Sequence, residues 1–504
     1  MEGNGAERNG AAAWQAGTGG EMRRERDFLG EMALPAGALY GIGTARARDN
    51  FALSSGAVNS RLIRAMVTVK KAAALTVLKF REAEGEIANP EGAGADAAGR
   101  MAEAVKFRAI AEACDRILAA APGVFGGGET GGPPGTGDPF FGAAFVVDAL
   151  QGGAGTSTNM NVNEVIANLA LGIMGKKPGE YEALHPLEDV NRFQSTNDVY
   201  PTALRIAAIL LLRDLSRRCA ELQESLQRRE AEFAALRKLG RTELMDAVPV
   251  TLGDEFGAWA QAVARDRWRL YKMEERLRQI NLGGQAVGLS GRGGRKVRFA
   301  MIEELRRLTG IGLAAAEYPM DITQNNDVFV EVSGLLKALA VNIMKISNDL
   351  RLMNSGPRGG LGEIRLAPLQ AGSTIMPGKV NPVICEMAMQ AAMKVMANDQ
   401  AVAMAAAHGE FELNPFLPLI AATLLESLSL LERTVFIFRT RCVELLTADA
   451  ERCAAHLEAS HAFAYGRVGD LGYVEVERII AEAGGDNEKI RAALDRAARG
   501  RRNG

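Results

Sequence analysis

Residues 201–239 read PTALRIAAILLLRDLSRRCAELQESLQRREAEFAALRKL. After the opening proline this stretch contains no glycine or proline, and its apolar residues recur at helical spacing. A helix of about 38 residues would be about 57 Å long, because each residue adds about 1.5 Å. This length exceeds that of an ordinary globular helix and favours a long helical bundle that is shared between subunits.

Three further stretches predict long helices, at about 252–280, at about 327–353 and after Pro382. Beyond about residue 445 the predicted helices become short, which indicates a small C-terminal domain. The expected organisation is a disordered tail (1–25), an N-terminal domain with Gly/Pro-rich insertions (26–195), a central long-helix domain (196–445) and a small C-terminal domain (446–504).

Two segments of the first third, 84–98 and 122–139, contain too much glycine and proline for a regular element. The second includes a formal G-x-G-x-x-G motif at residues 126–131. A dinucleotide-binding fold needs a helix directly after that motif, and Pro133-Pro134 prevents one. The motif therefore gives no support for a nucleotide cofactor.

Composition excludes several classes of protein. The 504 residues include 59 Lys+Arg and 61 Asp+Glu, a net charge of -2, which argues against a generally basic nucleic-acid-binding protein. No apolar run approaches the roughly 18 residues that span a membrane. The first 25 residues lack the apolar core of a signal peptide, and five scattered cysteines fit reduced thiols in a cytoplasm. We therefore expect a cytoplasmic, mostly α-helical protein.

Three loops rich in hydroxyl and amide groups precede predicted helices: 151–161, 194–198 and 371–382. In the second loop, Asp198 suits an N-cap and Pro201 the first helical turn. Helix N-termini carry unpaired N–H groups and partial positive charge, so hydroxyls placed there favour a bound anion. Each loop alone is most simply a set of helix caps, but three converging loops would form a dicarboxylate site.

Together the loops resemble a known family. GSTIMPGKVNP at 372–382 resembles the signature of the aspartase/fumarase superfamily. Four other stretches match the family in its order: QGGAGTSTNMNVNEV (151–165), NRFQSTNDVYPT (191–202), LGRTELMDAVPVTLGDEF (239–256) and NDLRLMNSGPRGGLGEI (348–364). The resemblance covers about residues 26–475, and within the superfamily the loops follow aspartate ammonia-lyase usage.

The resemblance implies a mostly α, three-domain fold with a long central bundle. Four subunits would form a twenty-helix core, and each active site would take loops from three subunits of the homotetramer. The implied reaction is the reversible elimination of ammonia from L-aspartate to give fumarate, through an aci-carboxylate intermediate. It implies a small dicarboxylate or amino-acid substrate and no cofactor or metal.

The resemblance also implies roles for individual residues. Ser373 would be the catalytic base, and because a serine hydroxyl is a weak acid it would need loop amides and Lys379 to populate its alkoxide. The β-carboxylate would be surrounded by Thr156, Ser195, Thr196 and Thr374. Lys379 and Asn381 would hold the α-carboxylate with help from Thr242, and Asn197 would lie near the amine.

Glu243 departs from the family, which commonly has His or Gln at this position. A carboxylate here would attract the substrate ammonium, with a Coulomb term of about 4 kcal/mol at 4 Å and an effective dielectric near 20 before desolvation. Glu386 matches a family glutamate close to this position, so the two carboxyls would share a proton unless the ammonium lies between them. The alternative is that Glu243 mimics Gln and only forms a hydrogen bond.

Other readings remain open. The runner-up activities are a class II fumarate hydratase and an ammonia-lyase for another amino acid, since Gly288-Leu289-Ser290 also departs from the family. A catalytically silent homologue is a third possibility, against which the intact Ser373 loop argues. Cys453, His456 and His461 have metal-ligand chemistry, but their spacing is not that of a standard zinc finger, so helix residues are the simpler interpretation.

Overall fold

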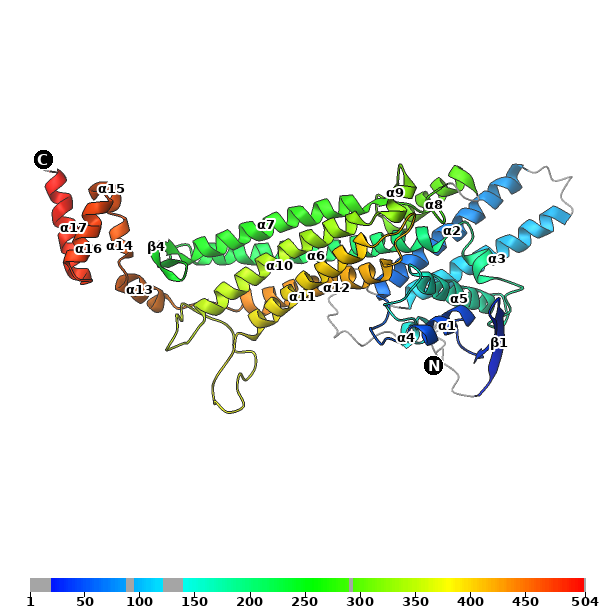
Figure 1. The fold of residues 1–504 in the computed structure, drawn as a ribbon, viewed down its shortest axis with the longest axis horizontal. Coiled ribbons are helices and arrows are strands. Elements are labelled where there is room, and N and C mark those ends of the chain that lie inside the picture. Colours follow the sequence, from blue (N-terminus) through cyan, green and yellow to red (C-terminus); the bar gives the residue numbers. More distant parts are fainter. Residues whose placement is uncertain (1–19, 88–94, 121–138, 290–292, 503–504) are drawn as a thin grey trace, which may run out of the picture. The chain divides into compact units, whose positions relative to one another are not determined.

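The computed structural model describes residues 20–87, 95–120, 139–289 and 293–502, and these are mostly helical (Figure 1). The earlier helices are α1 (Ile42–Asn50), α2 (Ser60–Ile87), α3 (Ala95–Ala119), α4 (Pro139–Ala144), α5 (Thr156–Ile173), η2 (Pro186–Val190), α6 (Thr196–Glu232) and α7 (Leu252–Leu277). The later helices are α8 (Gly294–Thr309), α9 (Pro319–Gln324), α10 (Asp327–Met353), α11 (Val383–Ala407), α12 (Leu417–Phe438), η3 (Arg439–Val443), α13 (Ala450–Ala459), α14 (Ala462–Tyr465), α15 (Val468–Leu471), α16 (Tyr473–Glu482) and α17 (Asn487–Arg502).

The strands of the described residues form two-stranded sheets only. The pairs are β1 (Met22–Asp27) with β2 (Gly30–Pro35), β3 (Arg237–Thr242) with β4 (Met245–Thr251), β5 (Gln279–Ile280) with β6 (Ala314–Ala315), and β7 (Ile364–Arg365) with β8 (Thr447–Ala448). Only β5 and β6 are parallel. The mostly α-helical fold is therefore confirmed. The strands form only short two-stranded pairs between or beside the helices.

The chain divides into two compact units. Unit 1 comprises the residues up to Asp214, Lys272–Gly334 and Ala397–Ser429. Within it α2 and α3 lie side by side (Figure 1), and α3 also packs on α5. The helices of this unit bury apolar faces, so that Met66, Ile110 and Ile166 are fully buried. This packing supplies most of the stability of helices this long.

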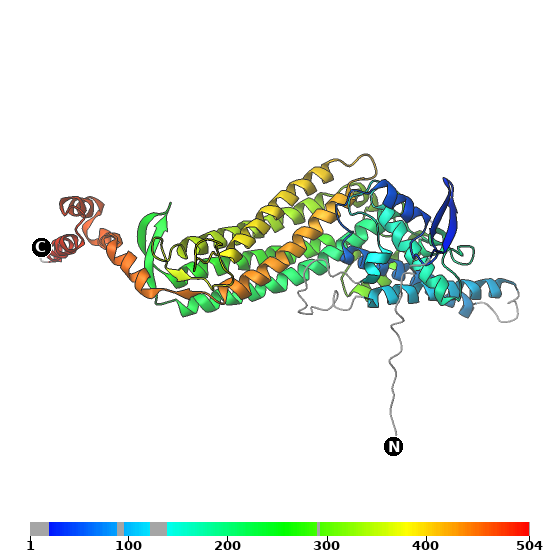
Figure 2. The ribbon, with the colours of Figure 1, turned by 90° about the horizontal axis from the view of Figure 1, so that it is seen from below.

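Unit 2 comprises Leu215–Tyr271, Leu335–Met396 and the chain from Leu430 on. In it α13 packs against β3. Figure 2 shows α13 beside the green β3–β4 hairpin. The short C-terminal helices share an apolar core of their own that includes Leu471, Ile479 and Ile490. The short helices expected after residue 445 are thus present.

The long helices agree with the sequence predictions except at their ends. The predicted helix at 327–353 has the bounds of α10. The predicted helix at 201–239 is wrong at both ends, because α6 begins at Thr196 and stops at Glu232. Residues 237–242 pair with 245–251 as an antiparallel hairpin instead. The charged stretch before the hairpin satisfies a helical pattern, and the pairing of the two strands overrides it.

The first third also differs from expectation in places. Strand β1 begins at Met22, inside the predicted tail, because it pairs along its length with β2. Helices α2 and α3 extend into the predicted break at 84–98, while residues 121–138, which include the G-x-G-x-x-G motif, lie outside the described residues. None of the helices that the structure describes is both long and apolar enough to cross a membrane.

Candidate active site

The first candidate loop leads directly into α5. Gly155 adopts a φ of +92°, and a Cβ atom there would lie 2.2 Å from a ring carbon of Tyr200, so only glycine fits. This glycine is the N-cap residue, so the helix begins at Thr156, inside the loop that the sequence predicts at 151–161. The Thr156 hydroxyl is exposed and donates to the carbonyl of Gly153 at 2.7 Å. Thr156 therefore lies at a helix N-terminus, where a bound anion is favoured.

The second candidate loop, 194–198, is joined to the first by a buried hydrogen bond. The side-chain amide of Asn159, on the first turn of α5, donates to Thr196 Oγ1 at 3.1 Å. The structure thus brings the Thr156 helix and the Ser195–Thr196 loop together within unit 1. Because Thr196 Oγ1 already accepts a hydrogen bond, its own hydrogen remains to be donated. Ser195 Oγ likewise accepts from the backbone N–H of Asn197 at 3.3 Å.

Asn197 is held in one orientation. Its side-chain N–H donates to the carbonyl of Ala286 at 2.7 Å. The side-chain oxygen of Asn197 is then the end that can accept a hydrogen bond from a ligand. An acceptor of this kind suits an ammonium group, which has only donors to offer.

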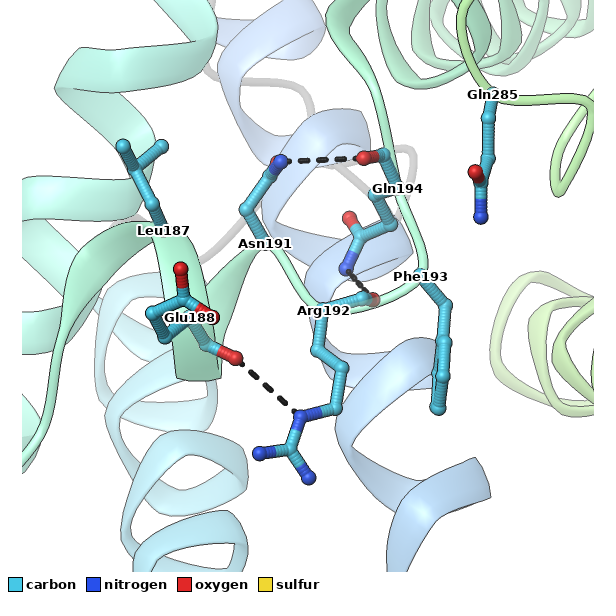
Figure 3. Close-up of a pocket in the computed structure, with 7 residues that line it drawn as sticks. All are labelled: Leu187, Glu188, Asn191, Arg192, Phe193, Gln194 and Gln285. Atoms are coloured by element: carbon cyan, nitrogen blue, oxygen red, sulfur yellow. Dashed lines mark hydrogen bonds between the residues drawn. The ribbon is translucent and has the colours of Figure 1, made fainter. Parts of the chain in front are cut away.

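A cavity of about 460 Å³ lies beside this loop. It is lined by residues that immediately precede Ser195 and by one residue of the segment after β5 (Figure 3): Leu187, Glu188, Asn191, Arg192, Phe193, Gln194 and Gln285. Figure 3 shows the wall held by the Asn191 amide bonded to the carbonyl of Gln194, and by the Gln194 amide bonded to the carbonyl of Arg192. The wall of the cavity next to Ser195 in sequence is therefore a hydrogen-bonded turn with polar side chains.

The third candidate loop, in unit 2, closes on itself around Ser373. The backbone N–H of Gly372 donates to the carbonyl of Lys379 at 2.8 Å, and the Asn381 amide donates to the carbonyl of Gly372 at 2.8 Å. A Cβ atom on Gly372 would lie 2.7 Å from the Lys379 carbonyl oxygen, so the closure requires glycine. Ser373, Thr374, Lys379 and Asn381 are consequently gathered on one loop, as the sequence predicts.

Ser373 Oγ accepts two backbone hydrogen bonds. The N–H of Met376 donates to it at 2.9 Å and that of Ile375 at 3.2 Å. Donors directed at an oxygen favour its charged form and lower the cost of an alkoxide. The side chain of Lys379, on the same loop, is exposed. Glu386 lies half-buried in the first turn of α11, the helix that follows this loop.

Thr242 and Glu243 lie at the tip of the β3–β4 hairpin, also in unit 2. Thr242 pairs with Met245, and the two residues between them, Glu243 and Leu244, have φ of +54° and +66°. Residues with side chains rarely adopt this conformation, and each costs of order 1 kcal/mol or more. The strained turn projects the exposed Glu243 side chain from the end of the hairpin.

A buried ion cluster anchors this hairpin. The carboxylate of Glu363, which is fully buried, lies 2.7 Å from Arg241 Nη1 and 2.9 Å from Lys238 Nζ. Lys238 also pairs with Glu255, whose carboxyl pKa is raised by burial. Both cations of this cluster therefore belong to β3 itself, and they fix the strand that ends at Thr242.

The residues with metal-ligand chemistry at 453–461 are engaged with backbone carbonyls. His456 Nε2 lies 2.9 Å from the carbonyl of Leu361, and Cys453 Sγ lies 3.7 Å from that of Glu363. Across the described residues no group of three or more His, Cys, Asp or Glu side chains is arranged to hold a metal ion.

Buried polar residues that the sequence did not single out support the loops. Asn159, Asn281 and Lys70 are all buried and bonded beneath the 194–198 loop or its neighbours. Such residues can be recognised in a sequence as polar residues within otherwise apolar helical stretches. Lys70, in a stretch of α2 that is rich in Val and Ala, is an example.

Known proteins are similar to this chain over nearly its whole length. A family model described as Lyase matches residues 141–397. The aspartate ammonia-lyase of Helicobacter pylori is 39% identical over 92% of this chain and 91% of that protein. The aspartate ammonia-lyase of Pseudomonas aeruginosa is 41% identical over 92% of this chain and 90% of its own length.

Solved structures agree in fold. The fumarate lyase:delta crystallin from Brucella melitensis is 41% identical, with a TM-score of 0.80, over 94% of this chain and 99% of that chain. A class II fumarase from Schistosoma mansoni is 26% identical, with a TM-score of 0.81, over 94% of this chain and 96% of that chain.

Proposed function

Because the chain belongs to the aspartase/fumarase superfamily of lyases, we propose that it catalyses the reversible elimination of ammonia from L-aspartate to give fumarate. It is thus a carbon–nitrogen lyase. The observation that carries the proposal is the hydroxyl of Ser373, which accepts two backbone hydrogen bonds inside the closed 372–381 loop. The relatives named aspartate ammonia-lyase support the choice of substrate.

Ser373 acts as the base that removes a proton from Cβ of aspartate. The amides of Ile375 and Met376 stabilise its alkoxide, and the positive charge of Lys379 assists. As the proton leaves, the β-carboxylate becomes a doubly charged aci-carboxylate. The electron pair then forms the double bond and ammonia departs from Cα. The chemistry consists of a proton transfer and an elimination, and needs no redox cofactor or metal.

The developing charge is stabilised by donors that are fixed before substrate arrives. Ser195 and Thr196 have hydroxyl hydrogens left to donate, and Thr374 adds a hydroxyl from the loop of the base. Thr156 is the exception, because its hydroxyl donates to the carbonyl of Gly153 and must turn to reach the β-carboxylate. The N-termini of α5 and α6 contribute partial positive charge.

The other end of the substrate is held by different groups. Lys379 pairs with the α-carboxylate, and Asn381 and Thr242 add hydrogen bonds. The ammonium group is accepted by the side-chain oxygen of Asn197 and by the carboxylate of Glu243. The ammonium group then lies between the carboxylates of Glu243 and Glu386 and offsets their negative charges. Both carboxylates can therefore stay ionised without sharing a proton.

The candidate residues divide between unit 1, with Thr156 and residues 195–197, and unit 2, with the hairpin and the Ser373 loop. We propose that they meet in a homotetramer whose active sites each take loops from three subunits. Exposed apolar side chains on the long helices of unit 2 support an oligomer: Trp268, Tyr271, Val341 and Met393. The division into three domains at residues 195 and 445, and a cytoplasmic location consistent with five free thiols, belong to the same proposal.

A substrate panel tests the proposal. Purified protein is offered L-aspartate, L-malate and other amino- and hydroxy-dicarboxylates, and fumarate or its analogue is measured by absorbance. Release of fumarate from L-aspartate is expected. Turnover of malate alone would replace the proposal with a fumarate hydratase, and turnover of another amine alone would change the substrate.

Replacement of Glu243 by Gln tests the ammonium site. The variant keeps the size and hydrogen-bonding capacity of the side chain but loses its charge. We expect the KM for L-aspartate to rise about tenfold, which corresponds to roughly 1.4 kcal/mol. Fumarate has no ammonium group, so its inhibition constant should stay within about twofold of the wild-type value. A twofold change corresponds to about 0.4 kcal/mol of binding free energy.

Glu303→Gln is the matched control, since it removes the same charge from an exposed position on α8, where Glu303 pairs with Arg306. Equal weakening of aspartate and fumarate binding by the Glu243 variant would refute the ammonium role and leave Glu243 as a mimic of Gln.

A further inference from the structure

Asp198 is a fully buried carboxylate that joins two segments of unit 1. Contrary to the N-cap expected from sequence, it lies at the third position of α6, because the helix begins at Thr196. One carboxylate oxygen accepts from the backbone N–H of Ser195 at 2.9 Å. The other accepts from the N–H groups of Gly283 and Gln285, at 3.0 and 2.9 Å. A helix cap needs only the first of these bonds.

The same two segments are joined a second time, one residue along. The Asn197 side chain donates to the carbonyl of Ala286, next to Gln285. In return, the Asn281 side chain donates to the carbonyl of Asn197 at 3.0 Å. That carbonyl is available because residue 201 is proline, which has no N–H to bond it within the helix. The proline that was expected in the first turn thus has a specific consequence inside α6.

We propose that Asp198 is a positioning residue that locks the 195–197 loop to the 283–286 segment and thereby aims Ser195, Thr196 and Asn197 at the substrate. The inference rests on the proposed function, in which these three side chains bind aspartate. Without the carboxylate, three backbone N–H groups lose their acceptor, and burial makes each unpaired group costly. The 283–286 segment is then free to shift, and with it the orientation of the Asn197 side chain.

The charges around Asp198 fit this role. Lys70 on α2 and Arg298 on α8 are the basic groups that act on it, and the segment from 281 to 288 carries no ionisable side chain. Burial raises the pKa of Asp198 to about 6 in spite of its three amide donors. Burial also lowers the pKa of Lys70 to about 7, and Lys70 Nζ donates to Asn191 at 2.7 Å. As the pH falls through about 6, Asp198 gains a proton and weakens as an acceptor.

Asp198→Asn is the test variant, because an amide has nearly the same shape but one of its ends is a donor. The NH2 group of the new amide would face backbone N–H groups, and two donors that face each other cannot form a hydrogen bond. We expect kcat/KM for L-aspartate to fall by about 10²-fold, the loss associated with a displacement of about 1 Å in an active site. In the wild-type protein kcat/KM should fall as the pH drops through about 6. This acid limb should be absent from the pH profile of kcat/KM of the variant.

Amide hydrogen exchange of Ser195, Gly283 and Gln285 should become at least about tenfold faster, since each 1.4 kcal/mol of lost protection is a factor of ten. This readout needs no activity. An inactive wild-type protein would refute the proposed function, whereas unchanged exchange in Asp198→Asn would refute the inference alone.

Asp266→Asn is the matched control. Asp266 is also a buried carboxylate with a pKa raised by burial, and it bonds Arg269 and Asn342 on α7 and α10. This control should keep the acid limb and the exchange rates at Ser195, Gly283 and Gln285. A variant Asp198→Asn with reduced activity but an unshifted acid limb would overturn the positioning role.

If Asp198→Asn does not fold, Asn281→Ser tests the lock from its other side. This change removes the bond to the Asn197 carbonyl, together with a bond from Asn281 to Thr323 Oγ1, and leaves Asp198 in place. A loss of kcat/KM of about tenfold with faster exchange around Gln285 supports the lock. Wild-type kinetics and exchange in Asn281→Ser would contradict it.

Discussion

Replacement of Ser373 by alanine is expected to lower kcat for L-aspartate by about 10²- to 10⁴-fold, the usual contribution of a positioned general base. The variant lacks the hydroxyl oxygen that accepts from the backbone N–H groups of Ile375 and Met376, so the base and its two stabilising donors are uncoupled. Steady-state kinetics by fumarate absorbance measure the loss. Because only one side-chain atom is removed, KM should change little.

The matched control is Ser460→Ala. Ser460 Oγ also accepts a backbone N–H two residues ahead, that of Ala462, but it lies at the end of α13. The control should retain wild-type kcat. Both variants should keep the wild-type oligomeric mass in sedimentation. A Ser373→Ala protein with more than about a tenth of the wild-type kcat, a loss under 1.4 kcal/mol, would remove Ser373 from its role as base.

Replacement of Lys379 by methionine is expected to lower kcat/KM for L-aspartate by about 10²- to 10³-fold. An ion pair with the α-carboxylate is lost in the substrate complex, and the cation that assists the Ser373 alkoxide is lost in the transition state, together worth about 3–4 kcal/mol. Methionine keeps most of the length of the chain. Separate values of kcat and KM are measured, and both should worsen.

Lys489→Met is the control, since Lys489 is an exposed lysine of α17 that pairs with Asp486. A fall confined to KM in Lys379→Met would show that the lysine only binds substrate. An unchanged kcat/KM would contradict both of its assigned roles.

The long helices could be predicted because their apolar spacing runs unbroken for many turns. The bounds of α10 agree with the predicted 327–353. The end of α6 could not be predicted in this way. Its last turns and the hairpin from Arg237 are both rich in charge, and the hairpin forms because β3 pairs with β4 and its cations pair with the buried Glu363.

It could be predicted which candidate residues lie together on the 372–381 loop, because its glycines and its hydroxyl and amide residues follow one another in sequence. The support beneath the 195–197 loop could not. Asn281 is 84 residues from the backbone carbonyl of Asn197 to which it bonds, and no local pattern marks that contact. Asp198 could be identified as a capping residue, but its bonds to residues 283 and 285 depend on the tertiary fold.

Each active site is proposed to combine loops from different subunits, and hybrid tetramers test this sharing. Ser373→Ala and Thr196→Val proteins, each expected to be nearly inactive alone, are mixed in equal amounts, dissociated and reassembled. If the Ser373 loop and the Thr196 loop of one site come from different chains, both are intact in about a quarter of the sites, and about a quarter of the wild-type activity should return. If activity stays at the level of the two parent variants, both loops of a site belong to one chain and the shared-site account is wrong.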